Sequence, residues 1–322
     1  MASSFRMVFC VEVIGWGIMV VMGAKLLFNC CYFFYTTYLA AALGHNLGPQ
    51  IKQYGSWAVV TGATDGIGKV YAQQLAALGL NIILVSRSSA KLQQVSDEIC
   101  RQNREIQIKT VAVDFTDGNA IYPKLKKELA HLFGQIGILV NNVGTKLPHC
   151  HIADVPSGEQ FNEIINCNVM SMVRLTNMLL PAMRKKKRGL IINIGSLSGT
   201  GFSPMRTTYG ATKAFVDKFS CDLAAECRSE GVVVQSILPG YVATKLPGLS
   251  GKSSFDVPTV ETYVEAAIRS LGVETRTAAY WFHKILLYWT ELLYFFVPNF
   301  VQKLTVIVIS RKTQMANVNK HE

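Results

Sequence analysis

The chain has 322 residues, 50% of them hydrophobic, and its 32 basic and 21 acidic residues give a net charge of +11 at pH 7. This length suffices for one large α/β domain with additional segments, and a mean hydropathy of +0.25 indicates parts that contact a membrane. Without zinc-ligand spacing or a nucleic-acid-binding module, the sequence predicts no metal site and no nucleic-acid partner. The eight cysteines form no C-x-x-C pair, which is typical of a reduced chain facing the cytosol.

The N-terminal segment is predicted to be a membrane anchor. Residues Met7–Ala24 are apolar except for Glu12, and a helix of this length spans about 27 Å, close to a hydrocarbon core of roughly 30 Å. Apolar residues continue from Leu26 to Leu43, so a hairpin of two segments is an alternative. A cleaved signal peptide with Ala40-Ala41-Ala42 as its processing site is another, although the apolar stretch is long for one. Residues His45–Tyr54 are expected to link this segment to the folded domain.

A glycine-rich turn, Thr61–Gly68 (TGATDGIG), follows the first predicted strand, Trp57–Val60, and precedes a helical pattern in Lys69–Leu78. Its spacing is G-x-x-x-G-x-G rather than G-x-G-x-x-G. A strand, a glycine-rich turn and a helix bind dinucleotides, because glycine lets the backbone approach the pyrophosphate at a helix N-terminus. The residues of the turn that are predicted to bind the cofactor are Gly62, Thr64, Asp65, Gly66, Ile67 and Gly68.

The end of the second predicted strand, Asn81–Val85, bears on the choice of cofactor. An acidic residue at this place would bind the ribose 2′-hydroxyl and favour NAD. The chain has Ser86 there with Arg87 beside it, a pair that suits the 2′-phosphate of NADPH. An ordinary surface arginine would give the same sequence.

Further strands alternate with helices along the chain. The predicted strands are Lys109–Val113, Ile138–Val140, Leu190–Ile194 and Val232–Leu238, and the helical patterns are Phe161–Met183, Thr208–Glu230 and Val260–Gly272. This alternation predicts a doubly wound parallel sheet of the Rossmann type. Such sheets bind ligands at the carboxyl ends of their strands, where the candidate site residues fall.

Tyr209 and Lys213 lie four residues apart in the predicted helix Thr208–Glu230, so both face the same side of it. An ammonium group beside a phenol favours the tyrosinate and lowers the phenol pKa from about 10, so the tyrosine can act as an acid or base near neutral pH. A surface pair on a helix is the alternative.

These motifs, in this order, resemble the short-chain dehydrogenase/reductase family over about residues 55–275. Ser196 lies 13 residues before Tyr209, which is the family's usual spacing. The resemblance implies the catalytic residues Tyr209, Lys213, Ser196 and Asn168. It also implies a wider set of cofactor contacts, which comprises Asp114, Asn141, Asn142, Val143, Gly144, Tyr209, Lys213, Pro239, Gly240, Val242 and Thr244.

The resemblance also implies a mechanism in which NADPH delivers a hydride to a ketone. Tyr209 donates a proton to the carbonyl oxygen, and Ser196 donates a hydrogen bond to the same oxygen. Lys213 lowers the tyrosine pKa and binds the nicotinamide ribose. Asn168 holds a water that links Lys213 to solvent, with a purely structural asparagine as the alternative.

Within the family the chain is most similar to the membrane-bound 17β-hydroxysteroid dehydrogenases, a group that includes very-long-chain 3-oxoacyl-CoA reductases. The similarity rests on the apolar N-terminus, Trp57–Val60, Gly137–Gly144, Val242–Lys245 and the tail from Arg276. It implies an endoplasmic reticulum membrane enzyme whose catalytic domain faces the cytosol, which reduces an acyl-CoA or a keto-steroid and can form a homodimer. A catalytically silent membrane scaffold on the same fold is the alternative.

The sequence predicts three parts: an anchor and linker (1–45), an NADP-binding reductase domain (46–275) and an amphipathic C-terminal extension (276–322). Aromatic residues mixed with charges in Tyr280–Ile309 favour an interfacial or substrate-covering segment over a membrane span. The final residues, Asn319–Glu322, contain no dilysine retrieval signal.

Two groups of basic residues lie outside these motifs. The run Arg184–Arg188 precedes the fifth strand, so it is expected at the sheet edge opposite the active site, as a solvated turn or a contact with an anionic membrane. Lys245 and Lys252 follow Pro239-Gly240 and are candidates for binding CoA phosphates, with mobile surface lysines as the alternative.

Overall fold

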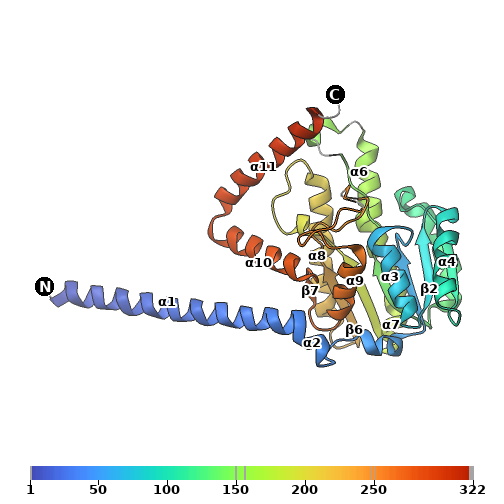
Figure 1. Cartoon of the computed structure of the whole chain (residues 1–322), viewed down its shortest axis with the longest axis horizontal. Helices are drawn as coiled ribbons and strands as arrows, with labels where there is room; N and C mark the ends of the chain where they lie inside the picture. Colours follow the sequence, from blue (N-terminus) through green and yellow to red (C-terminus); the bar gives the residue numbers. More distant parts are fainter. Residues whose placement is uncertain (1, 149–150, 156, 247, 250, 319–322) are drawn as a thin grey trace. The chain divides into compact units, whose positions relative to one another are not determined.

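The computed structural model describes residues 2–148, 151–155, 157–246, 248–249 and 251–318, so the predicted feature at Asn319–Glu322 lies outside the described residues. Contacts divide the chain into two units, Met1–His45 and Asn46–Glu322. Figure 1 shows their elements along the sequence.

The N-terminal unit is a continuous helical stretch. Helix α1 (Ala2–Phe34) runs into a π-helical turn, η1 (Tyr35–Leu39), and then into the short α2 (Ala40–Ala42). The two-segment hairpin is therefore not observed. Within the described residues, Glu12–Ala42 is long and apolar enough to cross a membrane, a test that a signal sequence also passes.

The second unit is built on a parallel sheet. Within the described residues this sheet has seven strands, in the order β3-β2-β1-β4-β5-β6-β7. The strands are β1 (Trp57–Thr61), β2 (Asn81–Ser86), β3 (Ile108–Ala112), β4 (Ile136–Asn141), β5 (Gly189–Ile194), β6 (Val232–Ile237) and β7 (Arg276–Thr277). The predicted doubly wound fold is confirmed, whereas the short edge strand β7 was not predicted.

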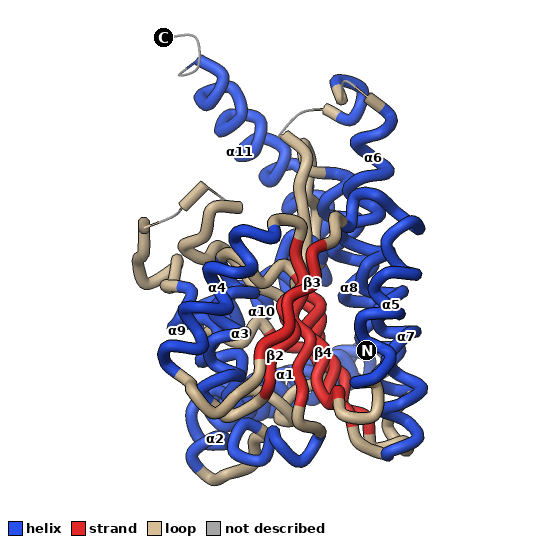
Figure 2. The backbone as a smooth tube through the Cα atoms, turned by 90° about the vertical axis from the view of Figure 1, so that its right-hand side faces the viewer, coloured by secondary structure: helices blue, strands red, loops and turns tan. Residues whose placement is uncertain are grey.

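Helices cover both faces of the sheet. In chain order the helices of this unit are α3 (Gly66–Ala77), α4 (Ser89–Gln102), α5 (Tyr122–Leu129), α6 (Gly158–Ile165), α7 (Ser171–Lys186), α8 (Thr207–Glu226) and α9 (Val260–Arg269), and α10 (Trp281–Phe296) and α11 (Pro298–Val318) follow the last strand as the C-terminal tail. Figure 2 shows the sheet edge-on, with α3, α4 and α9 on one side and α5, α7 and α8 on the other. A hydrophobic core lies on each face of the sheet. Along β1, Ala58 and Val60 belong to one core and Val59 belongs to the other, because successive side chains of a strand point to opposite faces.

The segment predicted to be a linker is largely packed into the folded unit. A 3₁₀ helix, η2 (Gly48–Tyr54), occupies most of it, and Ile51 is 1% exposed within the core. The Leu47 amide also donates a hydrogen bond to the Leu271 carbonyl (2.9 Å). The segment is therefore not a free linker as predicted, because the apolar side chain of Ile51 is buried in the hydrophobic core.

Two glycines let this segment enter the sheet. A Cβ at Gly55 would lie 2.5 Å from the Gln135 carbonyl oxygen, and one at Gly137 would lie 2.3 Å from the Tyr54 carbonyl group. Both distances are shorter than any real contact, so the two strands of backbone approach this closely because both residues lack a side chain.

The basic run lies where the sequence placed it. Lys186 donates a hydrogen bond from Nζ to the carbonyl oxygen of Ile136 (2.9 Å), the first residue of β4. Arg184 pairs with Glu230 just before β6. The run is thus at the amino ends of the strands, opposite the edge that carries the candidate site.

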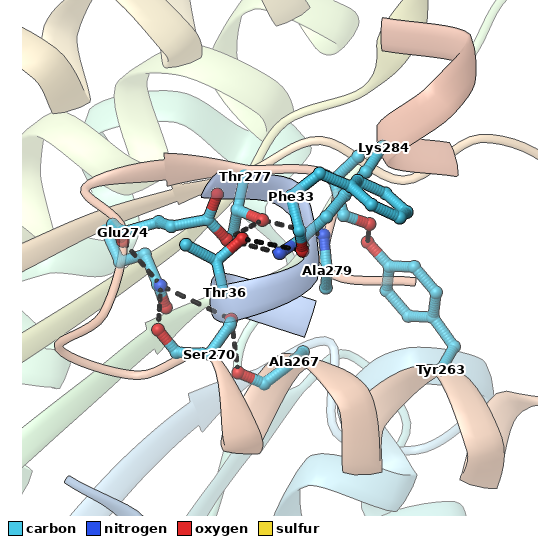
Figure 3. A network of polar contacts seen from close by, with 11 residues as sticks. Phe33, Thr36, Tyr263, Ala267, Ser270, Glu274, Thr277, Ala279 and Lys284 are labelled. Atoms are coloured by element: carbon cyan, nitrogen blue, oxygen red, sulfur yellow. Dashed lines mark hydrogen bonds and ion pairs between the residues drawn. The ribbon is translucent and has the colours of Figure 1, made fainter. Parts of the chain in front are cut away.

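Helix α10 is fixed to the fold by polar contacts, one group of which is drawn in Figure 3. Lys284 forms a buried ion pair with Glu274 (2.5 Å), and Glu274 also accepts a hydrogen bond from the Thr277 hydroxyl (2.9 Å). Arg276 joins Asp217 (2.8 Å) to Glu291 of α10 (2.6 Å). These contacts orient the helix so that an apolar stripe stays exposed, which comprises Leu286, Trp289, Leu293 and Phe296.

Candidate active site

The glycine-rich turn between β1 and α3 is shaped by close backbone contacts. Gly62 has φ +64°, a conformation that favours glycine. A Cβ at Gly68 would lie 2.3 Å from Asn142 Nδ2 and 2.4 Å from the Gly62 carbonyl oxygen. Asn142 itself donates from Nδ2 to the carbonyl oxygens of Thr61 (2.9 Å) and Gly62 (3.3 Å). The turn therefore keeps a side-chain-free surface at the N-terminus of α3.

The surroundings of this turn fit a dinucleotide. Asp65 caps α3 by accepting a hydrogen bond from the Gly66 amide (2.8 Å). A Cβ at Gly66 would lie 3.2 Å from Thr244 Cγ2, so the loop after β6 lies directly over the turn. At the end of β2 the Ser86 and Thr64 hydroxyls are 3.0 Å apart, and Arg87 is exposed beside them. The glycine-rich turn and the guanidinium group of Arg87 thus lie at the same edge of the sheet, where a phosphorylated nucleotide needs both.

Two predicted cofactor residues are held by other partners. Asn141 is buried and donates from Nδ2 to Asn193 Oδ1 (2.8 Å) and Thr176 Oγ1 (3.3 Å), between the sheet and α7. The Asp114 carboxylate accepts hydrogen bonds from the Thr116 amide (3.0 Å) and hydroxyl (2.8 Å). Strand alternation explains the first case, because consecutive residues Asn141 and Asn142 point to opposite faces.

Tyr209, Lys213 and Ser196 come together at the carboxyl end of β5. Tyr209 and Lys213 project from α8, and Ser196 follows β5 and shares a hydrogen bond with the Tyr209 hydroxyl. Lys213 Nζ lies 5.9 Å from the centre of the Tyr209 ring and donates to the Ile194 carbonyl oxygen (2.8 Å). The ammonium group thus lies near the phenol ring, on the same side of α8, as the spacing of the two residues predicts.

The electrostatics of this cluster differ from the expectation. Burial raises the Tyr209 pKa above its usual value, while the hydrogen bond with Ser196 and the charge of Arg206 act in the opposite direction. Burial lowers the Lys213 pKa to about 8. The predicted lowering of the Tyr209 pKa by Lys213 is not found, and the lysine ammonium group is bonded to the Ile194 carbonyl oxygen instead.

Asn168 lies in a π-helical turn, η6 (Asn166–Met170), that interrupts the predicted helix Phe161–Met183 between α6 and α7. Its Nδ2 donates to the Thr145 carbonyl oxygen (2.9 Å) and the Thr212 hydroxyl (3.0 Å), and its Oδ1 accepts from the Thr145 amide (2.7 Å). A Cβ at Gly144 would lie 3.4 Å from Asn168 Oδ1 and 3.5 Å from Lys213 Nζ. Asn168 thus ties the end of β4 to α8 beside the lysine.

A cleft opens beside Tyr209. It is lined by Leu147, Pro148, Ile152, Val155, Met205, Arg206, Thr207, Thr208 and Tyr209. Arg206 donates from Nη2 to the Tyr241 hydroxyl (3.1 Å). Arg206 was not predicted as a site residue, although its place three residues before Tyr209, at the N-cap of α8, is a usable signal.

His283 of α10 is a second residue that the sequence did not identify. Its Nδ1 accepts a hydrogen bond from the Gly240 amide (3.3 Å), and its Nε2 lies 3.3 Å from the Asp256 carbonyl oxygen. Burial lowers the His283 pKa to about 4, so the ring is neutral at pH 7 and carries its proton on Nε2. The tail therefore holds the predicted cofactor loop, in which Pro239, Gly240 and Val242 precede Thr244.

The loop lysines divide into two cases. Lys245 forms an ion pair with Asp65 (2.9 Å) and so lies across the glycine-rich turn, which argues against its predicted role as a free partner for CoA phosphates. Lys252 is exposed, so its predicted role stays a prediction.

A dinucleotide cradle next to a tyrosine, a lysine and a serine at the carboxyl edge of a parallel sheet defines an oxidoreductase that acts on a ketone or a hydroxyl group. Residues 56–252 match the model of the short chain dehydrogenase family, and the chain belongs to this family.

Relatives and solved structures agree with this assignment. A very-long-chain 3-oxoacyl-CoA reductase of Bos taurus is 46% identical over 259 residues, which are 79% of this chain and 80% of the relative. The structure of a 7β-hydroxysteroid dehydrogenase superposes with a TM-score of 0.65 at 26% identity, over 71% of this chain and 89% of the other. A short-chain dehydrogenase from Sphingobium yanoikuyae in complex with NADPH gives a TM-score of 0.58 at 28% identity, over 67% and 85% of the two chains.

Proposed function

We propose that this protein is an NADPH-dependent reductase of long-chain 3-oxoacyl-CoA substrates. The observation that carries the proposal is Tyr209, which shares a hydrogen bond with Ser196 and lines a cleft together with the apolar residues Leu147, Pro148, Ile152, Val155 and Met205. An acyl chain needs such an apolar lining. The names of the relatives that share 43–46% identity with this chain favour the same substrate class.

The cofactor, when bound, supplies the hydride. The turn from Gly62 to Gly68 offers main-chain amides at the N-terminus of α3 to the pyrophosphate. Ser86 and Arg87 supply a hydroxyl and a guanidinium group for the 2′-phosphate, and the absence of an acid at the end of β2 removes the usual partner of an unphosphorylated ribose. These features support NADPH over NADH.

Tyr209 serves as the general acid. Because burial raises its pKa, the phenol is protonated at neutral pH and has a proton to give to the carbonyl oxygen. Ser196 donates a hydrogen bond to the same oxygen, where negative charge develops during reduction. Lys213 would bind the nicotinamide ribose of the bound cofactor. Asn168 holds the main chain at Thr145 and so keeps the lysine's side of the cleft in place.

The protein resides in the endoplasmic reticulum membrane with its catalytic unit in the cytosol. The apolar helix Glu12–Ala42 supports an anchor, and the exposed stripe on α10 supports contact of the second unit with lipid. The test is carbonate extraction of the full chain and of a variant that lacks residues 1–45. The proposal requires that the full chain resist extraction and that the variant be released. It also requires that a glycosylation sequon introduced into the catalytic unit stay unglycosylated, as expected of a unit in the cytosol.

The catalytic proposal is tested by single-turnover oxidation of NADPH with purified full-length protein in detergent. Long-chain 3-oxoacyl-CoA, a keto-steroid and a buffer blank are compared, and each is repeated with NADH. We expect rapid reduction of the 3-oxoacyl-CoA with NADPH and slower turnover with NADH. Preferential turnover of the steroid would move the protein to the second substrate class, and equal use of NADH would overturn the cofactor assignment.

A further inference from the structure

One cation lines the cleft beside Tyr209 and a second lies near that cation, and the mechanism above leaves the purpose of both open. Arg206 lines the cleft, and its charge acts on Tyr209. Burial and the nearby charge of Arg206 both lower the pKa of Lys146. Among the described residues that line the cleft there is no acid, and within the described part of the chain neither cation forms an ion pair with a carboxylate.

The guanidinium group of Arg206 is incompletely satisfied. Nη2 donates to the Tyr241 hydroxyl, whereas Nε is buried and has no hydrogen-bond partner within the described residues. An unpaired buried donor and two neighbouring like charges both disfavour the folded state. Because the buried Nε is not accessible from the cleft, a ligand there supplies its acceptor to the partly exposed end of the guanidinium group, which carries further N–H donors.

The place of Arg206 limits what that acceptor can be. Arg206 and Tyr209 line the same cleft, so the acceptor lies next to the carbonyl group that Tyr209 protonates. The phosphates of CoA are separated from the ketone by the whole pantetheine arm and are too remote. A keto-steroid has no second oxygen beside its ketone. A 3-oxoacyl thioester has one, because its thioester carbonyl is separated from the ketone by a single methylene group.

We propose that Arg206 donates a hydrogen bond to the thioester carbonyl oxygen of a 3-oxoacyl substrate while Tyr209 and Ser196 bind its ketone oxygen. Lys146, which precedes Leu147 of the cleft lining, adds positive charge near Arg206. The two carbonyl groups are thus held at two points, and the substrate is selected for its 1,3-dicarbonyl unit. This inference rests on the proposed function and names the feature of the substrate that the site selects.

The test compares three substrates of equal chain length: a 3-oxoacyl-CoA, the matching 3-oxoacyl-N-acetylcysteamine thioester, which lacks phosphates, and a methyl ketone, which lacks the thioester. The readout is the ratio of kcat/KM for each thioester to that for the methyl ketone. Replacing a charged donor by a neutral one in Arg206→Gln should lower both ratios by roughly 10–100-fold. The matched control is Arg228→Gln, an exposed arginine just beyond the other end of α8, and it should leave both ratios unchanged.

Two further variants, Lys146→Gln and Arg206→Lys, distinguish a loss of the proposed contact from a folding defect in Arg206→Gln. Lys146→Gln should lower the two ratios by a smaller factor, and Arg206→Lys should restore part of the loss. An equal loss on all three substrates overturns the inference, because the arginine would then act through Tyr209 alone. A loss confined to the CoA ester also overturns it and assigns the cations to the phosphates. If wild-type protein reduces neither thioester, the proposed function fails as well.

Discussion

The two halves of the active site are built by different kinds of contact. On the cofactor side, main chain meets main chain: Gly68 approaches the Gly62 carbonyl so closely that a Cβ would lie 2.4 Å from it. On the substrate side, side chains from distant segments meet one another. Arg206 bonds to Tyr241, and the Tyr294 hydroxyl of α10 accepts a hydrogen bond from the Phe202 amide.

This difference governs what a substitution changes. A side chain added on the cofactor side displaces backbone and disturbs both folding and binding, because no rotamer relieves the clash. A side chain replaced on the substrate side alters one contact while the sheet beneath stays the same. The cofactor half is therefore intolerant of change, and the substrate half can change its selectivity at little cost in stability.

Tyr209→Phe is expected to have the largest effect, and it separates chemistry from binding. The variant loses one hydroxyl and with it the proton donor, so single-turnover reduction should fall by about 10²–10⁴-fold. NADPH binding, followed by fluorescence, should stay near the wild-type value because the phenol serves the carbonyl group. A reduction rate close to wild type would remove Tyr209 from the mechanism.

Gly68→Ala should instead disturb the cofactor half, where it weakens folding and cofactor binding. The new methyl group meets Asn142 Nδ2 at 2.3 Å and the Gly62 carbonyl, and overpacking of this kind costs about 1–3 kcal/mol of stability. We expect a lower midpoint of urea unfolding together with weakened NADPH binding. The matched control is Gly134→Ala, where the described structure has open space. Equal effects of the two variants would contradict the distinction between the halves.

His283 ties α10 to the loop after β6 and makes stability depend on pH. Its pKa of about 4 lies below the value of about 6.5 for an unfolded histidine, so the unfolded chain takes up a proton first as the pH falls. The aromatic rings of Tyr263 and Tyr280 and the Asp256 carbonyl surround it. Stability should be unaffected by this group above pH 6.5 and should fall by about 2 kcal/mol between pH 7 and pH 5.

The variant His283→Asn isolates this contribution. Asparagine can accept the Gly240 hydrogen bond through Oδ1 at the place of Nδ1, but it does not titrate. Urea unfolding at pH 7 and pH 5 should therefore show a smaller pH dependence in the variant than in wild type. An unchanged difference would mean that other groups cause the loss at low pH.

Arg87→Ala should give the smallest effect, since this side chain is exposed and its phosphate contact is weakened by solvent. We expect the preference for NADPH over NADH, measured as a ratio of kcat/KM, to fall by roughly tenfold. Affinity for NADH should remain the same. If both cofactors weaken equally, Arg87 does not contact the 2′-phosphate.

The sequence predicted the features that depend on local pattern. Apolar runs such as Trp57–Val60 identified the strands because a buried parallel strand needs no polar face. The spacing of Tyr209 and Lys213 identified their shared face because helical geometry fixes it. The orientation of Asn141 toward Asn193 and Thr176 was not predicted, because the phase of a strand decides which face of the sheet each of two adjacent asparagines occupies.

Features that depend on distant contacts could not be predicted in this way. The pKa of Tyr209 is set mainly by burial, which depends on everything packed around α8. His283 reaches Gly240 from a segment 43 residues away, and its neighbours in sequence do not reveal this contact. The strand β7 is two residues long and carries too few side chains to show a period.

The glycine pair at Gly55 and Gly137 has a consequence for evolution and for protein engineering. Each residue already has the smallest side chain possible, so an added side chain at one position cannot be compensated by a reduction at the other. Neutral substitution is therefore not possible at either glycine. We expect both glycines, and the close backbone contact between them, to persist while the surrounding residues change. A designer who transfers this catalytic unit to another anchor should make the junction before Asn46 and carry both glycines along with the whole segment between them.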